Sequence, residues 1–300
     1  MVTIRGANRE NPVVLFLHGG PGSTLSPFGA SLFHDWEQSF TVVQWDQRGA
    51  GRTYAKSGPS IEPTMTIDRM TQDGIEVAEY VRAHLDKKKI VLIGGSWGAV
   101  LGVYMARARP DLFHAYVGVA QIVSTEDWSA GYARTLELAR QATDQQSIAE
   151  LESIGPPPWN QLRKFGAWSR VTRAYEAKSS GQPLELRLST EYASDAEQQQ
   201  WAEAANFSQA HFFGLDMRGP LELLNLPTLG SNFGVPVFIL QGDADLKAVP
   251  KVTRAYFDQL RAPEKEFILV PQAGHEPNAE MLKAMLQTMK AKIEPLAMEP

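Results

Sequence analysis

The chain has 300 residues, of which 43% are hydrophobic, and a net charge of −5 at pH 7. That length and composition suit one large α/β domain with an insertion, and without a long basic run we expect no nucleic-acid partner. The sequence contains no cysteine, which excludes disulfides, thiolate metal sites and a cysteine nucleophile.

The sequence gives no sign of a membrane segment. No apolar stretch approaches the roughly 20 residues that a spanning helix needs. Near the N-terminus, Arg5, Arg9 and Glu10 interrupt any apolar run of the kind found in a signal peptide. We therefore expect a cytoplasmic protein that does not contact a membrane.

Short apolar runs alternate with helical patterns along residues 1–122. Residues 67–85 have helical spacing, and Asp68 is a candidate cap for the start of that helix. A second helix is predicted at residues 99–107. Buried strands are predicted at residues 13–17, 40–45, 89–93 and 115–120. Strands that alternate with helices indicate a mostly parallel sheet covered on both faces.

The pattern changes over residues 123–232, which are rich in Ala, Gln, Glu and Arg and contain no convincing buried strand. This segment is interpreted as a helical lid inserted into the α/β core. The core resumes over residues 233–300, with strands predicted at 235–240 and 267–270 and amphipathic helices at about 250–260 and 277–292.

Residues 94–98, Gly-Gly-Ser-Trp-Gly, join a predicted strand to a predicted helix. A strand, a Gly-x-Ser-x-Gly turn and a helix form the nucleophile elbow, in which a strained turn holds the serine at a helix N-terminus. A Cβ at Gly94 or Gly98 would collide with neighbouring backbone. Alone, the motif also fits an ordinary glycine-rich turn, but here it predicts Ser96 as a nucleophile.

A serine hydroxyl needs a base, and the base needs an acid that orients it. Asp243 and Asp245 follow one predicted strand and His275 follows the next, so that all lie where ligands bind in open α/β sheets. The order Ser96, Asp245, His275 matches the serine–acid–histidine order of one fold class. Asp245 is favoured over Asp243 by its Gly-x-x-Asp placement, and either could instead be a turn residue.

Residues 18–22, His-Gly-Gly-Pro-Gly, follow the first predicted strand. Acyl transfer requires two fixed N–H donors for the developing oxyanion. The backbone N–H of Trp97 is one candidate, and Gly20 in the glycine turn is the other. A turn used only for chain reversal is the alternative, and the position directly after a core strand argues against it.

Together these segments resemble the α/β-hydrolase superfamily, and within it the proline iminopeptidase-like branch. Residues 46–53, Asp-Gln-Arg-Gly-Ala-Gly-Arg-Thr, are typical of this branch and are interpreted as a supporting loop held by hydrogen bonds of Arg48 and Asp46. The resemblance implies an α/β-hydrolase fold and serine hydrolase chemistry through an acyl-enzyme, with no metal or organic cofactor. Its substrate would be a small molecule or a short peptide.

Two departures from the family stand out. The family normally has an N-terminal hairpin and entry strand ahead of the residues present here, so we expect the sheet to lack a strand or two at one edge. The characteristic Trp-x-x-Trp-Glu stretch of the lid is absent, although the family uses lid carboxylates to hold the substrate's amino group. Glu203 faintly resembles one such position, and a solvated helix glutamate is the alternative.

Three functions remain open on this basis. The leading hypothesis is aminopeptidase-like cleavage of small amides or esters. A carboxylesterase or lactonase with an apolar acyl pocket under the lid is the nearest alternative. Some of the lid tryptophans and phenylalanines would line that pocket. A non-catalytic receptor is the third. Oligomeric state cannot be inferred from the sequence.

Overall fold

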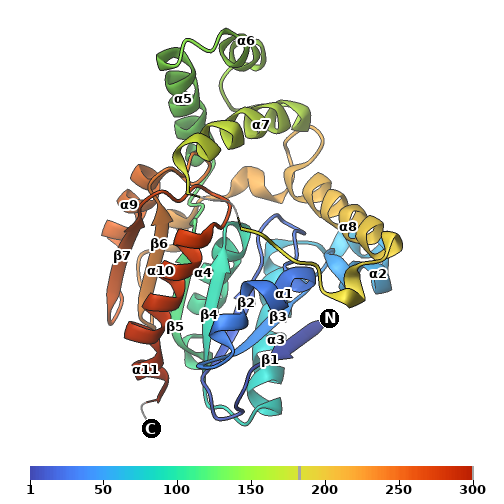
Figure 1. The fold of residues 1–300 in the computed structure, drawn as a ribbon, viewed down its shortest axis with the longest axis vertical. Coiled ribbons are helices and arrows are strands. Elements are labelled where there is room, and N and C mark those ends of the chain that lie inside the picture. The colour runs from blue at the N-terminus through green and yellow to red at the C-terminus, as the bar shows by residue number, and fades with distance from the viewer. Residues whose placement is uncertain (182–183, 299–300) are drawn as a thin grey trace.

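A seven-stranded sheet in the order β1-β3-β2-β4-β5-β6-β7 organises the chain (Figure 1). The computed structural model describes residues 1–181 and 184–298. Strand β1 pairs with β3 antiparallel, and the other strand pairs are parallel. The strands are β1 (Val2–Arg5), β2 (Val13–Leu17), β3 (Thr41–Trp45), β4 (Ile90–Gly95), β5 (Phe113–Val119), β6 (Val237–Gly242) and β7 (Lys265–Val270).

The helices follow the predicted alternation in both core segments. They are α1 (Gly29–Leu32), α2 (Gly51–Ser57), α3 (Ile67–His84), α4 (Trp97–Ala108), α5 (Glu126–Gln141), α6 (Gln145–Ile154), α7 (Leu162–Ser179), α8 (Asp195–Phe213), α9 (Pro250–Gln259), α10 (Ala279–Thr288) and α11 (Glu294–Met298). The prediction of an α/β-hydrolase fold with a mostly parallel sheet is confirmed.

The central strands are apolar throughout because helices cover both faces of the sheet. Leu15 and Leu92 point to one face, where they pack in the same cluster as residues of α3, α4 and α9. Their neighbours Phe16 and Ile93 point to the other face, toward α1 and α10. Side chains alternate along a strand, so a strand buried on both faces has no polar alternate positions.

Two local features differ from what the sequence indicated. Residues 2–5, for which no strand was predicted, form the edge strand β1 and pair with β3 in the register Val2–Trp45. The cap of α3 is Thr66, whose side chain accepts a hydrogen bond from the Arg69 N–H. Asp68 instead lies inside the first turn, where a carboxylate interacts favourably with the helix dipole.

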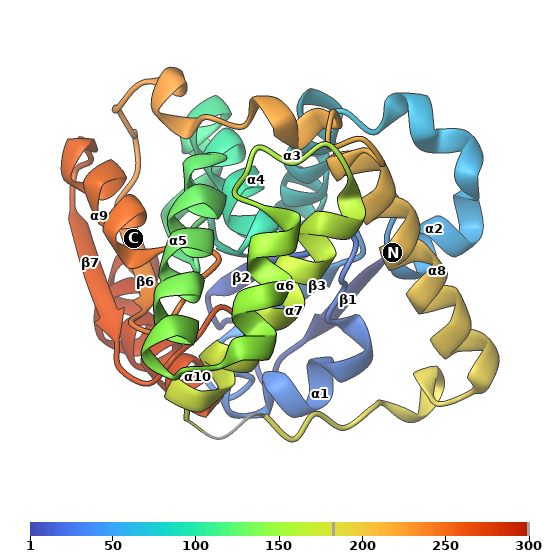
Figure 2. The same cartoon turned by 90° about the horizontal axis from the view of Figure 1, so that it is seen from above.

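Helices α5 to α8 lie between β5 and β6 in the sequence, and α5, α6 and α7 stand together beyond one end of the sheet (Figures 1 and 2). Their aromatic side chains pack mainly against each other. The rings of Trp159 and Trp168 are 5.3 Å apart, and those of Phe165 and Phe213 are 4.5 Å apart. Many aromatic side chains of this segment therefore pack against each other.

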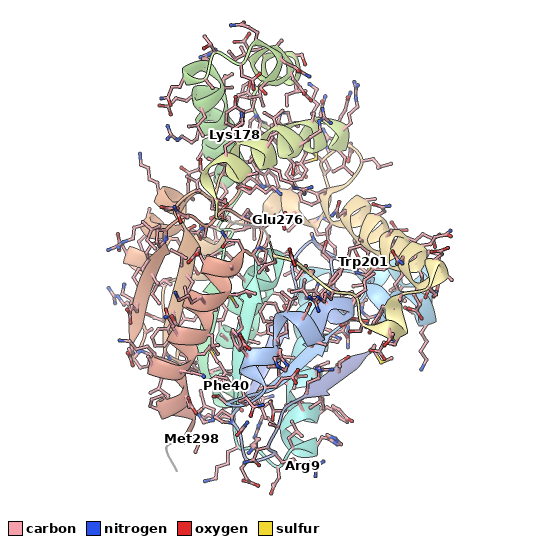
Figure 3. The ribbon with its side chains drawn as sticks, in the orientation of Figure 1. Arg9, Phe40, Lys178, Trp201, Glu276 and Met298 are labelled. Carbon is pink, nitrogen blue, oxygen red and sulfur yellow. The ribbon has the colours of Figure 1, made fainter. Side chains whose placement is uncertain are left out.

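Helix α8 diverges from α5–α7 and packs beside α2 (Figure 2). The rings of Tyr54 on α2 and Phe207 on α8 are 4.7 Å apart. Trp201, also on α8, donates its indole N–H to the Thr24 carbonyl (Figure 3). These contacts fix α8 against the first core segment.

Candidate active site

The turn between β4 and α4 forces Ser96 into an unusual backbone conformation, with φ 55° and ψ −117°. A residue with a side chain rarely adopts such a conformation unless the surrounding structure imposes it. A Cβ on Gly94 would lie 2.1 Å from the Gly98 carbonyl oxygen, and one on Gly98 would lie 2.0 Å from the Leu17 carbonyl oxygen. The predicted collision at both glycines is therefore confirmed, and it explains why the serine is flanked by glycines.

Ser96, His275 and Asp245 come together from the ends of three strands. The Ser96 Oγ lies 2.9 Å from His275 Nε2. The other ring nitrogen, Nδ1, lies 3.1 Å from each carboxylate oxygen of Asp245. An ionised carboxylate only accepts hydrogen bonds, so Nδ1 carries the proton and leaves Nε2 free to accept from the serine hydroxyl.

Asp245 is buried and its carboxylate is fully engaged. One oxygen accepts the N–H groups of Lys247 at 2.9 Å and Ala248 at 2.8 Å, and the other accepts from Gln241 Nε2 at 2.8 Å. Asp243 is exposed, and its backbone N–H donates to the Val270 carbonyl. Of the two candidate acids, the structure brings Asp245 to His275.

Two opposing effects set the pKa of His275. Burial lowers it, but the charge and hydrogen bond of Asp245 outweigh burial, so the pKa rises above its usual 6.5. Among the smaller effects, the charge of Lys247 lowers the pKa of His275 and the charge of Glu176 raises it. A histidine whose Nε2 faces the serine hydroxyl and whose pKa is raised is suited to accept and return a proton.

The glycine turn of residues 18–22 lies directly against the serine, since a Cβ on Gly19 would lie 3.2 Å from the Ser96 Cβ. Gly20 has φ +113°, a conformation that side chains rarely permit. Within the described residues, the N–H groups of Gly20 and Trp97 donate no hydrogen bond. Both candidate oxyanion donors are therefore available.

His18 and Gln47 hold this turn in place. A backbone N–H can only donate, so His18 Nε2 accepts from the Gln47 N–H at 3.2 Å and Nδ1 carries the proton toward the Gly19 carbonyl. Burial lowers the pKa of His18, which favours its neutral form. The Gln47 side chain donates to the His18 carbonyl and accepts the Trp97 indole N–H at 2.9 Å. Gln47 thus links the glycine turn to the elbow.

Asp46 and Arg48 form the predicted supporting loop. Asp46 accepts from the Thr24 and Ser26 hydroxyls. Arg48 makes a two-pronged ion pair with Asp73 on α3, at 2.6 and 2.9 Å. These contacts fix the loop beside the glycine turn rather than presenting charged groups to Ser96.

The structure does not bring Glu203 to this cluster. Glu203 is exposed on α8, and its carboxylate accepts a hydrogen bond from Gln199 one turn earlier. This is the solvated helix glutamate of the alternative interpretation. His211, also on α8, lies 2.7 Å from the Met65 carbonyl oxygen through Nε2.

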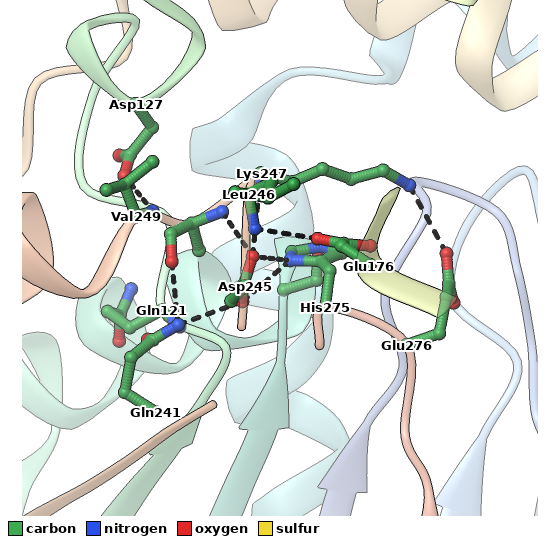
Figure 4. A network of polar contacts seen from close by, with 12 residues as sticks. Gln121, Asp127, Glu176, Gln241, Asp245, Leu246, Lys247, Val249, His275 and Glu276 are labelled. Atoms are coloured by element: carbon green, nitrogen blue, oxygen red, sulfur yellow. Dashed lines mark hydrogen bonds and ion pairs between the residues drawn. The ribbon is translucent and has the colours of Figure 1, made fainter. Parts of the chain in front are cut away.

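Two buried carboxylates near the triad were missed. Asp127 is fully buried near the start of α5, and Glu176 on α7 is 4% exposed. Figure 4 shows both attached to the loop that follows Asp245. A signal for Glu176 existed, because it shares the apolar face of α7 with Trp168 and Thr172, where a charged residue is out of pattern.

Among residues 1–181 and 184–298, no cluster of three or more His, Asp or Glu side chains is arranged to hold a metal ion. None of the helices in the same ranges is both long and apolar enough to cross a bilayer.

Residues 12–280 match the family described as alpha/beta hydrolase fold. The chain belongs to this family. The hydrolase is 31% identical over 290 residues to the protein named probable aminopeptidase YbaC of Bacillus subtilis, an alignment that covers 93% of this chain and 88% of the relative. The comparison with such relatives places it in the proline iminopeptidase-like branch.

Solved structures share the fold of the hydrolase. The crystal structure of VinJ superposes with a TM-score of 0.70 at 21% identity, covering 98% of this chain and 94% of that one. The proline iminopeptidase of Mycobacterium smegmatis gives a TM-score of 0.66 at 18% identity, covering 99% and 96% of the two chains.

Proposed function

We propose that this hydrolase cleaves small amides or esters through a Ser96 acyl-enzyme, with aminopeptidase-like preference for short substrates that carry a free amino group. The observation that carries the proposal is the continuous contact from Ser96 Oγ to His275 Nε2 at 2.9 Å and from His275 Nδ1 to Asp245 at 3.1 Å. The names of the relatives support the peptidase preference.

The proposed reaction has two halves. His275 Nε2 takes the Ser96 proton as Oγ forms a bond to the substrate carbonyl carbon, and the N–H groups of Gly20 and Trp97 stabilise the oxyanion. The carbonyl–leaving group bond breaks, and the amine or alcohol departs with the proton from His275. Water then attacks the acyl-enzyme, gives a proton to His275, and releases the acid as Ser96 Oγ regains that proton. Asp245 stays ionised and holds the imidazole.

We also propose that residues 123–232 act as the lid that selects substrate. Helices α5–α7 stand over the strand ends where Ser96 lies, and the acid loop contacts two of them. A carboxylesterase or lactonase is the second candidate. It is favoured by the position of Glu203, which is exposed and bonded to Gln199 rather than facing the triad.

Hydrolysis of a prolyl arylamide and of a short-chain nitrophenyl ester tests these proposals. Ser96→Ala is compared with Ser153→Ala, which removes an exposed serine hydroxyl of the lid helix α6. We expect Ser96→Ala to lose turnover of both substrates and Ser153→Ala to keep it. Arylamide turnover supports the aminopeptidase, and ester turnover alone supports the esterase. Unchanged activity in Ser96→Ala would rule out the acyl-enzyme mechanism, and no Ser96-dependent turnover of any substrate would favour a receptor.

A further inference from the structure

The loop of residues 245–249, here called the acid loop, is held by the lid as well as by the core (Figure 4). From α7, Glu176 Oε1 accepts the N–H of Leu246 at 2.7 Å. From α5, Asp127 Oδ1 accepts the N–H of Val249 at 3.1 Å. Leu246 also packs so closely on α5 that a Cβ on Gly131 would lie 2.1 Å from its carbonyl oxygen. Two lid helices, α5 and α7, therefore contact the segment that begins with Asp245 and bond its backbone.

The backbone bonded by Glu176 belongs to the residue next to the acid. Asp245 accepts the N–H groups of Lys247 and Ala248, so the acid loop folds around its own carboxylate. A shift of Leu246 would move those N–H groups and rotate the carboxylate against His275. The orientation of the imidazole thus depends on contacts that originate in the lid.

We propose that Glu176 and Asp127 are positioning residues through which lid helices α7 and α5 hold Asp245, and thereby His275, in the orientation required for proton transfer from Ser96. This inference rests on the proposed function of the triad. It assigns to the lid a part in setting the geometry of the base, in addition to covering the substrate.

The two carboxylates differ in a way that allows a sharp test. Asp127 uses both oxygens, since Oδ2 also accepts the N–H groups of Val123 and Ser124. Asp127→Asn would therefore turn an amide NH₂ against a backbone N–H. Glu176 bonds only Leu246 through the contacts described, so Glu176→Gln retains an acceptor oxygen and removes the charge.

Charged groups face Glu176 from several elements. His275 comes from the segment after β7, and Asp245 and Lys247 come from the acid loop. Arg173 and Lys247 both contact Glu276, which lies beneath α7 (Figure 3). Burial, with the Asp245 charge, raises the pKa of Glu176 to about 7, and the Glu176 anion in turn raises the pKa of His275.

The test compares Glu176→Gln and Glu176→Leu with Glu137→Gln, which removes an exposed carboxylate of α5 paired with Arg134. We expect Glu176→Leu to lower kcat by up to about 10²-fold with little change in KM, the size of a small misplacement of catalytic groups. Glu176→Gln should retain most of kcat and shift the acidic limb of kcat/KM to lower pH. Glu137→Gln should change neither.

A second readout needs no substrate. The downfield NMR resonance of the His275 Nδ1 proton reports the ionisation of this histidine and the bond to Asp245, and we expect it to titrate at lower pH in Glu176→Gln. If Glu176→Leu does not fold, the pH profile and the NMR resonance of Glu176→Gln still test the proposal. Unchanged kcat, pH profile and resonance in folded variants would overturn the proposal, as would an effect confined to KM. Failure of the proposed function would appear instead as activity that survives Ser96→Ala.

Discussion

The close approach of the elbow to β2 gives a prediction that can be worked out from the structure. In Gly98→Ala the new Cβ would lie 2.0 Å from the Leu17 carbonyl oxygen and 2.6 Å from its carbon, whereas real Cβ contacts essentially never fall below 3.0 Å. Backbone cannot move aside as a flexible side chain can. The end of β2 must therefore retreat from α4, and it carries with it the glycine turn that contains Gly20.

Two effects of Gly98→Ala should be measurable. Overpacking of this kind costs about 1–3 kcal/mol of unfolding free energy, and each kcal/mol lowers Tm by about 2–4 °C in domains of 150–250 residues. Displacement of an oxyanion donor by about 1 Å can cost on the order of 10²-fold in rate. We expect a lower Tm by circular dichroism and a lower kcat/KM on the preferred chromogenic substrate.

Gly95→Ala is the matched control for stability, because its Cβ meets no neighbouring atom within 4 Å in the described part of the chain. It changes the same five-residue turn by the same methyl group, and we expect the wild-type Tm. If Gly98→Ala kept both the Tm and the kcat/KM of the wild type, the steric explanation of the flanking glycines would be refuted.

Three further predictions concern the surrounding groups. The charge and hydrogen bond of Asp245 raise the pKa of His275 by more than burial lowers it, so the acidic limb of kcat/KM should lie above pH 6.5. Asp245→Asn should lower kcat on the order of 10⁴-fold. A pH–rate profile without an acidic limb would contradict this role of His275. Gln47→Leu leaves the buried Trp97 indole N–H without its acceptor, which should lower the free energy of unfolding by about 1–3 kcal/mol in urea titrations, and an unaltered midpoint would count against the link. Folding raises the pKa of Glu176 from 4.5 to about 7, so the native state binds the proton more tightly and this group's contribution to stability falls as pH rises from 4.5 to 7. In Glu176→Gln the free energy of unfolding should therefore depend less on pH in this range. An identical slope of unfolding free energy against pH in both proteins would disprove this prediction.

Much of the core could be predicted because its signals are local. A strand buried on both faces, such as β4, is a continuous apolar run, and the Gly-x-Ser-x-Gly motif is read within five residues. Gly94 is required by a contact inside that turn, with Gly98, although Gly98 itself is required by Leu17 on β2. Strand β1 was missed because its four residues are half-buried at an edge and carry no comparable apolar run. Thr66 was missed as a cap although the helix begins at Ile67 as predicted, because the nearby Asp68 is an equally common capping residue type.

The lid contacts could not be predicted because their partners are distant in sequence. Glu176 bonds a backbone N–H that lies 70 residues later, and Asp127 bonds one that lies 122 residues later. A backbone partner has no side-chain signature, so no residue type in the acid loop indicates what will hold it. The exposure of Glu203 depends likewise on how α8 packs against α2, which periodicity does not reveal.

The insertion of the lid between two adjacent strands has a consequence for how the protein can change. Strands β5 and β6 pair directly, Val119 with Leu240, although the entire lid separates them in sequence. The entropy cost of closing a loop grows only logarithmically, by about 0.6 kcal/mol for each doubling of length. The sheet can therefore accept lids of very different length, and substrate preference can evolve while the core persists. A transplanted lid would still have to supply the anchors of Asp127 and Glu176, so compatibility with the acid loop, rather than length, sets the limit on exchange.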